Sequence, residues 1–384
     1  MLTKRIKFKN FQFKSNISNT KKKLSQLLKK KNYVFLSMGR NYKDNYTKTL
    51  IQKFKKYKSF RIIGMGGSSL GTRAIYDFLK SKINKNFVFF DNLQIVKNKN
   101  KKYVNLIVSK SGNTIETIVN ANIFIKKNEK NIFITENKNN YLINLAQKLK
   151  SEIIHHSNYI GGRYSVLSEV GMLPAELMDL NPNKFRQFNT LIKNKNFLNT
   201  LVKNVSTTLN LVKNKKFNSV IINYDESSEN LFKWYQQLIA ESLGKKSKGI
   251  LPVISSMPKD NHSLMQLYLD GPKKNFYTFF HVLGENSLKI NNNEILPSHK
   301  HLKNKNLTKI LYSQKLATEE VFLRKKIPFR SFEVIKRNEK TLGELFCFFI
   351  LETILLGRSL NVNPFDQPSV ELIKEETKKI LLRS

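Results

Sequence analysis

Cysteine and acidic residues are both scarce in this sequence. Its 384 residues include one cysteine, Cys347, and only 28 aspartates and glutamates against 68 lysines and arginines. A single thiol excludes a disulfide framework and a thiolate metal site within one chain, and its position in an apolar run predicts a core residue. The basic surplus gives a formal net charge of +40, a feature shared with many nucleic-acid-binding proteins.

The distribution of the basic residues argues against a nucleic-acid partner. Lysines occur along the whole length, accompanied by many Asn, Ile and Phe residues. The surplus therefore indicates a bias across the chain and not one basic stripe. We expect no nucleic-acid partner, although the positive field should attract small anionic substrates.

Long apolar runs are also lacking. The longest, 345–356, is interrupted by Glu352, and it is well below the roughly 20 residues that a helix needs to span a bilayer. Residues 1–16 are basic and lack the apolar stretch of a secretory signal. These absences predict a soluble, cytoplasmic protein.

The stretch 60–79 is predicted to form a strand, a glycine turn and a helix. An apolar run ends in glycines at positions 64, 66 and 67, and Ser68 precedes an amphipathic pattern. Glycines let the backbone turn tightly, and the helix start beyond them offers unpaired N–H donors and a partial positive charge. Such a unit can hold a phosphate, but the same arrangement also occurs where nothing binds.

A second strand leads into a loop rich in hydroxyl groups. The strand expected at 103–108 is followed by Ser109, Lys110, Ser111 and Thr114, and a helix is predicted directly after them. Hydroxyl groups at a helix start can surround a phosphate without burying a full opposing charge. The glycine-lysine pair of a nucleotide P-loop is absent. One hydroxyl would be an ordinary helix cap, but three exceed what capping needs.

Strands and helices alternate along the chain, which predicts an α/β fold with doubly wound parallel sheets. An Asn- and Lys-rich segment, 181–216, marks the expected domain boundary. We divide the chain into a basic, helical extension 1–50, a first domain 51–185 and a second domain 186–384 with C-terminal helices. Ligands should bind beyond the carboxyl ends of the strands. The expected strands are 60–63, 87–90, 104–108, 132–135, 153–155, 219–223, 250–254 and 276–280.

An arginine turn follows the last strand expected in the first domain. Arg163 follows two glycines, which permit close approach of the backbone, and it supplies a permanent cation to any adjoining cleft. A solvated turn arginine is the alternative. The nearby His155 and His156 have no third ligand at metal spacing, so we interpret them as structural residues and expect no metal site.

A long predicted helix in the second domain carries a carboxylate on its apolar side. An apolar line through Trp234 and Leu238 continues at three- and four-residue steps to Glu241. A carboxylate entering an apolar pocket suits general-base chemistry near neutral pH. Gln237 lies one turn earlier on the neighbouring surface. The alternative is that Glu241 reaches water or pairs with Lys245.

Two further segments carry groups that can move protons. His262 precedes a short predicted helix, 264–269, and lies near its N-terminus; a capping or surface histidine is the alternative. Close to the end of the chain, Gln367 and Pro368 begin a last helix that carries Lys374. Gln367 and Lys374 are two turns apart, so both can face one side of that helix.

Together these motifs resemble the phosphoglucose isomerase family. GMGGSSLG is similar to the first sugar-binding loop of that family, SKSGNTIET to its phosphate loop, and GGRYS to its arginine turn. QQLIAESLGK resembles the catalytic glutamate helix, NHSLMQL the histidine segment, and NPFDQPSVELIK the carboxyl-terminal signature. The six matches occur in family order from about residue 60 to 375.

The resemblance implies two sugar isomerase domains that interconvert glucose 6-phosphate and fructose 6-phosphate. The reaction would proceed through a cis-enediol intermediate, in glycolysis and gluconeogenesis, without a metal or cofactor. Carried over by motif, Ser109, Ser111 and Thr114 would hold the phosphate of the sugar. Lys110 and Ser68 would lie beside them.

The resemblance also assigns the proton-transfer groups. Glu241 matches the base that carries a proton between the two carbons, and Arg163 matches the cation that faces the enediolate. His262 and Lys374 match the pair that opens the sugar ring. The residue types fit the chemistry, because aldose-ketose isomerisation needs a base, an acid/base for the ring and fixed positive charge. The substrate-contacting glutamines of the family correspond to Gln237 and Gln367.

The family histidine comes from the neighbouring subunit, which implies a homodimer with shared active sites. The sequence departs from the family at two positions: Ser69 stands where many relatives have an acidic residue, and Ser111 where many have threonine. The chain is also shorter than most of the family. Substrate preference and the dimer contacts therefore follow less directly from the resemblance than the reaction type does.

Three other functions remain as alternatives. A dual phosphoglucose and phosphomannose isomerase would differ by its action on mannose 6-phosphate. A sugar-phosphate-binding regulator built from the same domains would not need Glu241, His262 and Lys374, and no helix-turn-helix is evident. An amidotransferase linked to such domains is disfavoured, because the N-terminal region has no cysteine nucleophile.

Overall fold

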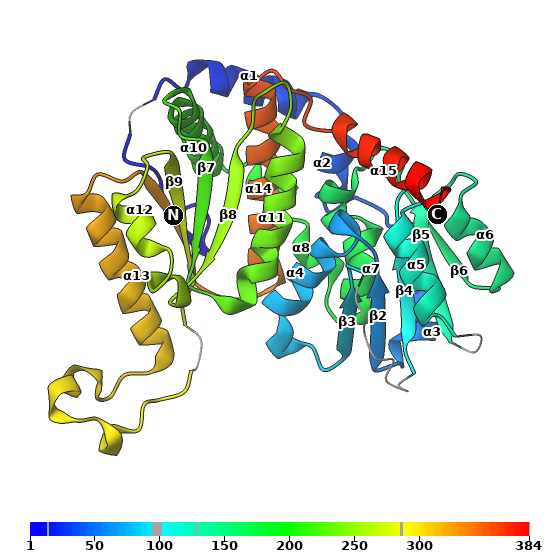
Figure 1. Cartoon of the computed structure of the whole chain (residues 1–384), viewed down its shortest axis with the longest axis horizontal. Coiled ribbons are helices and arrows are strands. Elements are labelled where there is room, and N and C mark those ends of the chain that lie inside the picture. Colours follow the sequence, from blue (N-terminus) through cyan, green and yellow to red (C-terminus); the bar gives the residue numbers. More distant parts are fainter. Residues whose placement is uncertain (14, 94–101, 127–128, 285–286, 384) are drawn as a thin grey trace.

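Two five-stranded sheets, each flanked by helices, lie side by side in the computed structural model (Figure 1). The structure describes residues 1–13, 15–93, 102–126, 129–284 and 287–383. The α/β architecture predicted from the alternating pattern is confirmed. Each expected strand is present, with bounds that differ by at most two residues at either end.

The first sheet has the strand order β3-β2-β4-β5-β6, and all of its pairings are parallel. The order reverses between β2 and β4, and such a reversal point is where open α/β sheets bind their ligands. The two loops singled out in the sequence follow these two strands. The strands are β2 (Ser59–Ile63), β3 (Asn86–Phe90), β4 (Val104–Val108), β5 (Lys130–Glu136) and β6 (Glu152–His156).

The second sheet has the strand order β1-β10-β9-β7-β8. Its strands are parallel except β1, which pairs antiparallel with β10 at the edge. The basic extension packs on the body of the protein as expected, and it also adds this unpredicted edge strand. The strands are β1 (Ile6–Lys9), β7 (Asn218–Asn223), β8 (Leu251–Ser256), β9 (Asn275–Val282) and β10 (Phe329–Val334).

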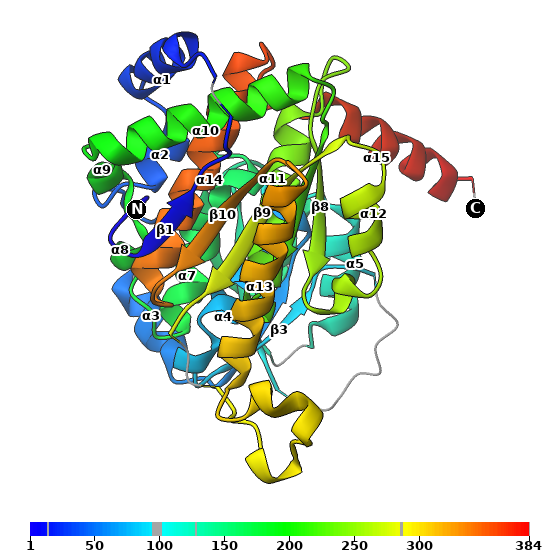
Figure 2. The same cartoon turned by 90° about the vertical axis from the view of Figure 1, so that its left-hand side faces the viewer.

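Helices cover both faces of each sheet, and alternate strand residues contact opposite helix layers. Ile221 of β7 belongs to the core shared with α11 and α14, whereas Val220 and Ile222 pack with α12 and α13 on the outer face. On the first sheet, α4 and α7 cover the inner face, and α5 and α6 the outer face. Figures 1 and 2 show these layers. The helices named are α4 (Leu70–Phe78), α5 (Ile115–Phe124), α6 (Tyr141–Lys148), α7 (Glu169–Leu177), α11 (Glu229–Leu243), α12 (Met265–Asp270), α13 (Leu307–Arg324) and α14 (Glu339–Ser359).

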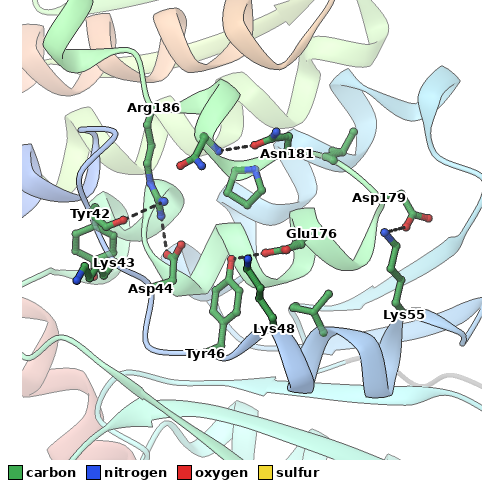
Figure 3. Close-up of a pocket in the computed structure, with 14 residues that line it drawn as sticks. Tyr42, Lys43, Asp44, Tyr46, Lys48, Lys55, Glu176, Asp179, Asn181 and Arg186 are labelled. Carbon is green, nitrogen blue, oxygen red and sulfur yellow. Dashed lines mark hydrogen bonds and ion pairs between the residues drawn. The ribbon is translucent and has the colours of Figure 1, made fainter.

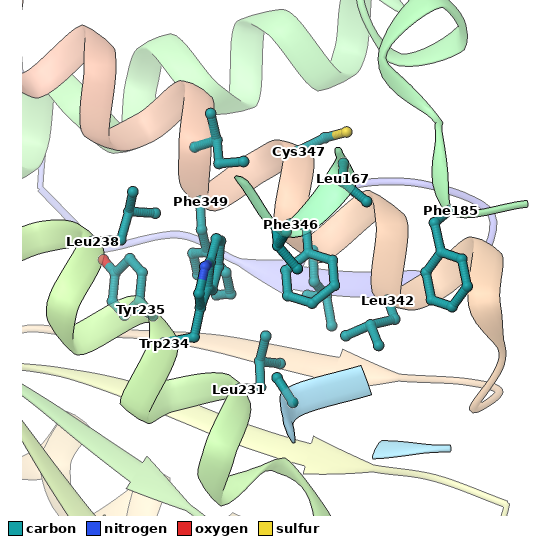
Figure 4. Close-up of a cluster of buried hydrophobic side chains, with 14 of the residues drawn as sticks. Leu167, Phe185, Leu231, Trp234, Tyr235, Leu238, Leu342, Phe346, Cys347 and Phe349 are labelled. Carbon is teal, nitrogen blue, oxygen red and sulfur yellow. The ribbon is translucent and has the colours of Figure 1, made fainter. Parts of the chain in front are cut away.

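One continuous hydrophobic core joins the two sheets. Trp234 of α11 meets Phe346 of α14 edge to face, with ring centroids 4.8 Å apart, and Tyr235 lies 4.4 Å from Phe349 (Figure 4). Nearly every side chain of α14 is buried, which explains why its sequence reads as the longest apolar run. Since α11 is fixed in this core, the groups at its C-terminal end have a rigid support.

The carboxylate that interrupts this apolar run is buried and paired. Glu352 of α14 forms an ion pair with Arg330 of β10. It also accepts hydrogen bonds from Asn204 (2.5 Å) and Tyr235 (3.0 Å). Cys347 is fully buried in the same helix, and burial raises the pKa of its thiol to about 12. The prediction that this cysteine is a core residue is confirmed. Within the described ranges, every helix is too short or too polar to cross a bilayer.

The Asn- and Lys-rich segment that was expected to mark the domain boundary is largely helical, and the division into three parts stays a prediction. Arg186, just beyond α8, bonds Asp44 at 2.6 Å, and Glu176 of α7 accepts a hydrogen bond from Tyr46 at 3.0 Å (Figure 3). These contacts anchor the basic extension to the first sheet. The remaining α-helices are α1 (Ser18–Lys29), α2 (Tyr33–Ser37), α3 (Lys48–Lys55), α8 (Pro182–Phe185), α9 (Phe188–Leu191), α10 (Lys195–Lys213) and α15 (Pro368–Leu381).

Candidate active site

The glycine turn after β2 touches the arginine turn that follows β6. Gly66 has a φ of +52°, a conformation that L side chains rarely adopt. A Cβ on Gly67 would lie only 2.2 Å from the carbonyl carbon of Gly162. The glycines therefore serve the close approach of two turns that are far apart in the sequence. This contact fixes Arg163 beside the carboxyl end of β2.

The hydroxyl-rich loop lies at the carboxyl end of the adjacent strand β4. Ser109 and Thr114 bond each other through their hydroxyl oxygens at 2.9 Å, directly before α5. Ser111 is exposed at the tip of the loop. A Cβ on Gly64 would lie 3.1 Å from the Cβ of Ser68 and 2.7 Å from the carbonyl oxygen of residue 108. The glycine turn thus brings Ser68 next to the start of the hydroxyl loop.

Lys110 points away from the hydroxyl cluster in this structure. Its ammonium group donates a hydrogen bond to the carbonyl oxygen of Asn158 at 2.7 Å. Partial burial lowers the pKa of this ammonium group, while Glu136 opposes that shift. The lysine therefore joins the hydroxyl loop to the segment that leads into the arginine turn.

Arg163 is the centre of the candidate site. Its guanidinium group is buried and donates hydrogen bonds to the hydroxyl of Ser242 (2.8 Å), to the side-chain oxygen of Gln367 (2.8 Å), and to the carbonyl oxygens of Pro364 (2.7 Å) and Asp366 (3.0 Å). The alternative of a solvated turn arginine is wrong. The arginine instead connects the first sheet to the end of α11 and to the C-terminal turn.

Glu241 lies against this cation. One carboxylate oxygen is 3.2 Å from the guanidinium of Arg163, and the other accepts a hydrogen bond from Gln237 at 3.0 Å. The side chain of Glu241 is 21% exposed, so it is neither in bulk solvent nor sealed from a ligand. Lys245 pairs with Asp366 at 2.8 Å instead, and the proposed pairing of Glu241 with Lys245 is therefore wrong.

The surroundings of Glu241 differ from the apolar pocket expected from the helix pattern. The buried face of α11 continues from Leu238 to Ser242, and Glu241 lies at its margin. The sequence pattern could not show which of the two residues continues the buried face, because positions 241 and 242 lie three and four residues beyond 238, which is about one helical turn in both cases. The carboxylate meets a cation and an amide in place of apolar side chains.

Contacts connect the carboxylate to the hydroxyl loop. A Cβ on Gly66 would lie 2.8 Å from the side-chain nitrogen of Gln237, so this glutamine rests on the glycine turn. The turn carries Ser68, which adjoins the end of β4. Residues expected at one site are therefore assembled along a single edge: Gln367, Arg163, Glu241, Gln237, Ser68, Ser109 and Thr114.

In the part of the chain that the structure describes, two expected site residues have no hydrogen bond or ion pair with the residues of this edge. His262 is exposed near the start of α12, on the outer face of the second sheet. Glu241 belongs to α11, which packs on the inner face. Lys374 lies on α15, a helix without buried residues, and it pairs with Glu371 at 2.7 Å. The positions of His262 and Lys374 in the sequence did not indicate on which side of the folded chain they would lie.

Of the paired histidines at the end of β6, His156 has structural contacts. His156 is buried, and its two ring nitrogens lie 3.1 Å from a carboxylate oxygen of Glu169 and 3.0 Å from the carbonyl oxygen of Ile160. His155 is exposed. Among the residues that the structure describes, no three His, Cys, Asp or Glu side chains are grouped as metal ligands would be.

The sequence did not predict three contacts that support Arg163. Ser242 bonds both Arg163 and the hydroxyl of Tyr164, the latter at 2.9 Å. The indole nitrogen of Trp234 donates to the carbonyl oxygen of Arg163 at 3.1 Å. Two features of the sequence could have indicated these contacts: a serine on an otherwise apolar helix face, and a lone tryptophan. Both carry polar atoms that need a partner when they are buried.

Several solved structures share this fold. A hypothetical protein from Thermus thermophilus superposes with a TM-score of 0.80 at 24% identity, covering 95% of this chain and 94% of that one. A glucose-6-phosphate isomerase from Chlamydia trachomatis gives a TM-score of 0.73 at 17% identity, covering 95% and 84%. The chain shares its fold with this isomerase and with a tagatose-6-phosphate ketose/aldose isomerase from Escherichia coli, which gives a TM-score of 0.52 at 13% identity and covers 83% of this chain and 88% of that one.

Sequence comparison narrows this shared fold to one family. The chain belongs to the phosphoglucose isomerase family, whose model matches residues 50–383. Glucose-6-phosphate isomerase from Methanocaldococcus jannaschii is 33% identical over 362 residues, which cover 87% of this chain and 86% of that protein. The family inferred from the six motifs is confirmed, and with it the enzyme class of an aldose-ketose isomerase.

Proposed function

We propose that this chain interconverts glucose 6-phosphate and fructose 6-phosphate by moving one proton with Glu241. Family membership supports the reaction. One observation supports Glu241 as the base. Its carboxylate contacts both Arg163 and Gln237, at the edge where the hydroxyl loop lies. A base, a fixed cation and an anion-binding loop are what this isomerisation requires.

The phosphate group of the sugar is proposed to bind in the hydroxyl loop. Ser109, Ser111 and Thr114 precede the ten-residue helix α5, whose first N–H groups and dipole favour an anion. Ser68 would add a hydroxyl from the adjacent turn. Lys110 would add positive charge to the rim of the loop without forming part of its hydroxyl cluster, since its ammonium group already bonds Asn158.

The proton transfer follows from the position of the carboxylate. With fructose 6-phosphate bound, Glu241 takes a proton from C1, and the electrons of that bond form the C1–C2 double bond of an enediolate. The negative charge goes to the oxygen on C2, where Arg163 stabilises it. A proton then passes from the hydroxyl on C1 to the oxygen on C2, and the carbonyl forms at C1 as the same carboxylic acid returns its proton to C2, which produces open-chain glucose 6-phosphate. Gln237 and Gln367 would orient the sugar hydroxyls.

Ring opening is proposed to use groups that one chain does not assemble. His262 and Lys374 match the ring-opening pair of the family, yet His262 lies on the outer face of the second sheet. A homodimer in which a second copy supplies His262 would complete the site. We propose this assembly, with activity in glycolysis and gluconeogenesis in the cytoplasm.

A dual activity on mannose 6-phosphate is the second candidate. Glucose 6-phosphate and mannose 6-phosphate share one enediol and differ in the face of C2 that receives the proton. Ser69, which stands where many relatives have an acidic residue, is buried and its hydroxyl bonds the carbonyl oxygen of Gly66 at 3.3 Å. The serine therefore stabilises the glycine turn, and the assay with mannose 6-phosphate decides the specificity.

The proposed reaction is tested by incubating the purified chain with fructose 6-phosphate in deuterium oxide. The expected product is glucose 6-phosphate with deuterium at C2, since a proton held on a carboxyl group exchanges with solvent. Product that carries no deuterium even after many turnovers would contradict transfer through an exchangeable carboxyl proton. No product would favour the sugar-phosphate-binding regulator.

A further inference from the structure

A second cavity lies at the amino ends of the strands of the second sheet, away from the hydroxyl loop and Glu241. It has a volume of about 530 Å³, within the range of small-molecule sites. The end of α12, the start of β9 and the segment between α13 and β10 form its walls. Its lining residues are Phe13, Lys216, Tyr268, Leu269, Asp270, Gly271, Pro272, Lys273, Asn275, Tyr277, Lys325, Lys326, Ile327 and Pro328.

The base of this cavity is aromatic and its polar atoms are already paired. Tyr268 and Tyr277 are buried and meet edge to face, with centroids 5.4 Å apart. The hydroxyl of Tyr277 donates to the carbonyl oxygen of Tyr268 at 3.2 Å, and the hydroxyl of Tyr268 donates to Ser255 at 3.3 Å. Because these two rings are largely buried, the apolar surface open to a ligand comes mainly from the exposed ring of Phe13, together with the half-buried Ile327.

The rim of the cavity is cationic. Four of the lining residues are lysines and one is an aspartate, and Asp270 is already paired with Lys325 at 2.6 Å. Within the described part of the chain, Lys273 and Lys326 have no carboxylate partner. Lys216 donates to the carbonyl oxygen of Lys273 at 2.6 Å. Partial burial, and then repulsion from Lys273 and the neighbouring lysine at position 274, lower the pKa of Lys216.

The cavity in Figure 3 differs in its charge balance. That cavity, of about 510 Å³, is lined by four cationic and three anionic side chains. Arg186 pairs with Asp44, and Lys55 pairs with Asp179 at 3.2 Å. Its charges hold the extension in place, whereas the cavity beside α12 has unpaired positive charge above an aromatic base.

We propose that the cavity beside α12 binds a small anion that carries a planar ring, of the nucleoside phosphate class. The ring would contact the aromatic and aliphatic base of the cavity, where burial of apolar surface favours binding. The phosphates would meet the ammonium groups of Lys273 and Lys326 at the rim. This site is separate from the proposed sugar phosphate site, so the two can be occupied together.

Isothermal titration with adenosine triphosphate tests this proposal. We expect saturable binding, at least about tenfold tighter than that of inorganic tripolyphosphate or of adenosine alone. The double variant Lys273→Glu, Lys326→Glu should bind at least about tenfold more weakly, and its isomerase activity should equal that of the unmodified chain. The matched control is Lys300→Glu, Lys303→Glu, which makes the same charge change at exposed positions outside the cavity.

Three results would overturn the proposal. Absence of binding at millimolar adenosine triphosphate would exclude a site of this class. Equal affinity for tripolyphosphate would show that the ring makes no contribution. Equal weakening in the cavity variant and in the control would show that net charge, and not this cavity, attracts the nucleotide.

Discussion

Arg163 illustrates what residue types in a sequence can and cannot predict. Two glycines before an arginine suggested a cation directed into a cleft, and the resemblance to a family gave it a role. The pattern carried no information on the four acceptors that surround the guanidinium group in the structure. Those acceptors come from two other segments, near positions 242 and 364–367, and long-range contacts of this kind are fixed only by the fold.

The hydroxyl of Ser242 is predicted to position this cation. In Ser242→Ala, the buried guanidinium and the hydroxyl of Tyr164 each lose a partner. We expect a loss of about 1–3 kcal/mol of unfolding free energy and a kcat that falls more than KM rises, because the hydroxyl loop proposed to hold the phosphate is unchanged. Urea unfolding and steady-state kinetics measure the two effects.

A surface serine provides the control for this variant. Ser25 is exposed on α1, and Ser25→Ala should change the unfolding free energy by less than about 0.5 kcal/mol. If Ser242→Ala behaves like Ser25→Ala in both measurements, Ser242 does not hold the arginine in place.

His281 is predicted to make the protein less stable in mild acid. The side chain is buried on β9, stacks on Tyr312 at 5.4 Å, and faces Glu333 of β10 and Lys315 of α13. Burial is the main cause that lowers the pKa of His281 in the folded state, and Lys315 adds to it. The unfolded chain therefore binds a proton first as the pH falls through about 6.5. Stability should decrease from that pH downward and level off below the folded-state pKa.

Thermal unfolding between pH 8 and pH 5 measures this effect. His281→Gln should show a shallower decrease of Tm with acidification than the unmodified chain. His155→Gln, at an exposed position, should keep the original slope. A His281→Gln variant with an unchanged slope would assign the acid sensitivity to other groups.

At the scale of elements, the strands that line the site were predictable because they are buried on both faces. Short apolar runs such as 104–108 read directly as parallel strands. The edge strand β1 was not predictable, since its four residues alternate Ile and Phe with lysine in a basic segment. Its pairing with β10 joins residues more than 300 positions apart, a contact that no local pattern encodes.

The contact between the two glycine turns is predicted to be needed for both stability and activity. In Gly67→Ala, the new Cβ would lie 2.2 Å from the carbonyl carbon and 2.3 Å from the carbonyl oxygen of Gly162, and 2.5 Å from the backbone nitrogen of Arg163. The turns must separate, so we expect a loss of about 1–3 kcal/mol of stability. Displacement of Arg163 by about 1 Å should reduce kcat about 10²-fold.

A neighbouring glycine is the matched control. A Cβ on Gly161 would come no closer than 3.8 Å, to a ring carbon of Tyr164, which is an ordinary contact. Gly161→Ala should therefore keep the stability and activity of the unmodified chain. Equal effects at both positions would mean that the contact between the turns does not matter for catalysis.

At the scale of the whole molecule, one chain presents only part of the proposed machinery. The proposed base, cation and phosphate loop meet at one edge, whereas His262 is exposed on the outer face of the second sheet and Lys374 is exposed on α15. The resemblance assigned the histidine to a neighbouring subunit, but the sequence did not indicate on which face of this chain His262 lies. The homodimer proposal accounts for this division of the site.

Mixing two inactive variants tests the shared site. Glu241→Gln and His262→Ala should each be nearly inactive as homodimers. In a mixed dimer, one site would combine the intact Glu241 of one copy with the intact His262 of the other. After joint unfolding and refolding of equal amounts, half of the dimers are mixed and half of their sites are intact, so roughly a quarter of full activity should return. No recovery would mean that both residues act within one chain or that His262 has no part.

The central claim is that the carboxylate of Glu241 carries the proton between the two carbons. The most direct test is the turnover of fructose 6-phosphate to glucose 6-phosphate by the unmodified chain, by Glu241→Gln, and by the control Glu229→Gln on the same helix, whose side chain is exposed and paired with Lys233. We predict a decrease of about 10²- to 10⁴-fold for Glu241→Gln and unchanged turnover for Glu229→Gln. Equal turnover by Glu241→Gln and the unmodified chain would contradict the account.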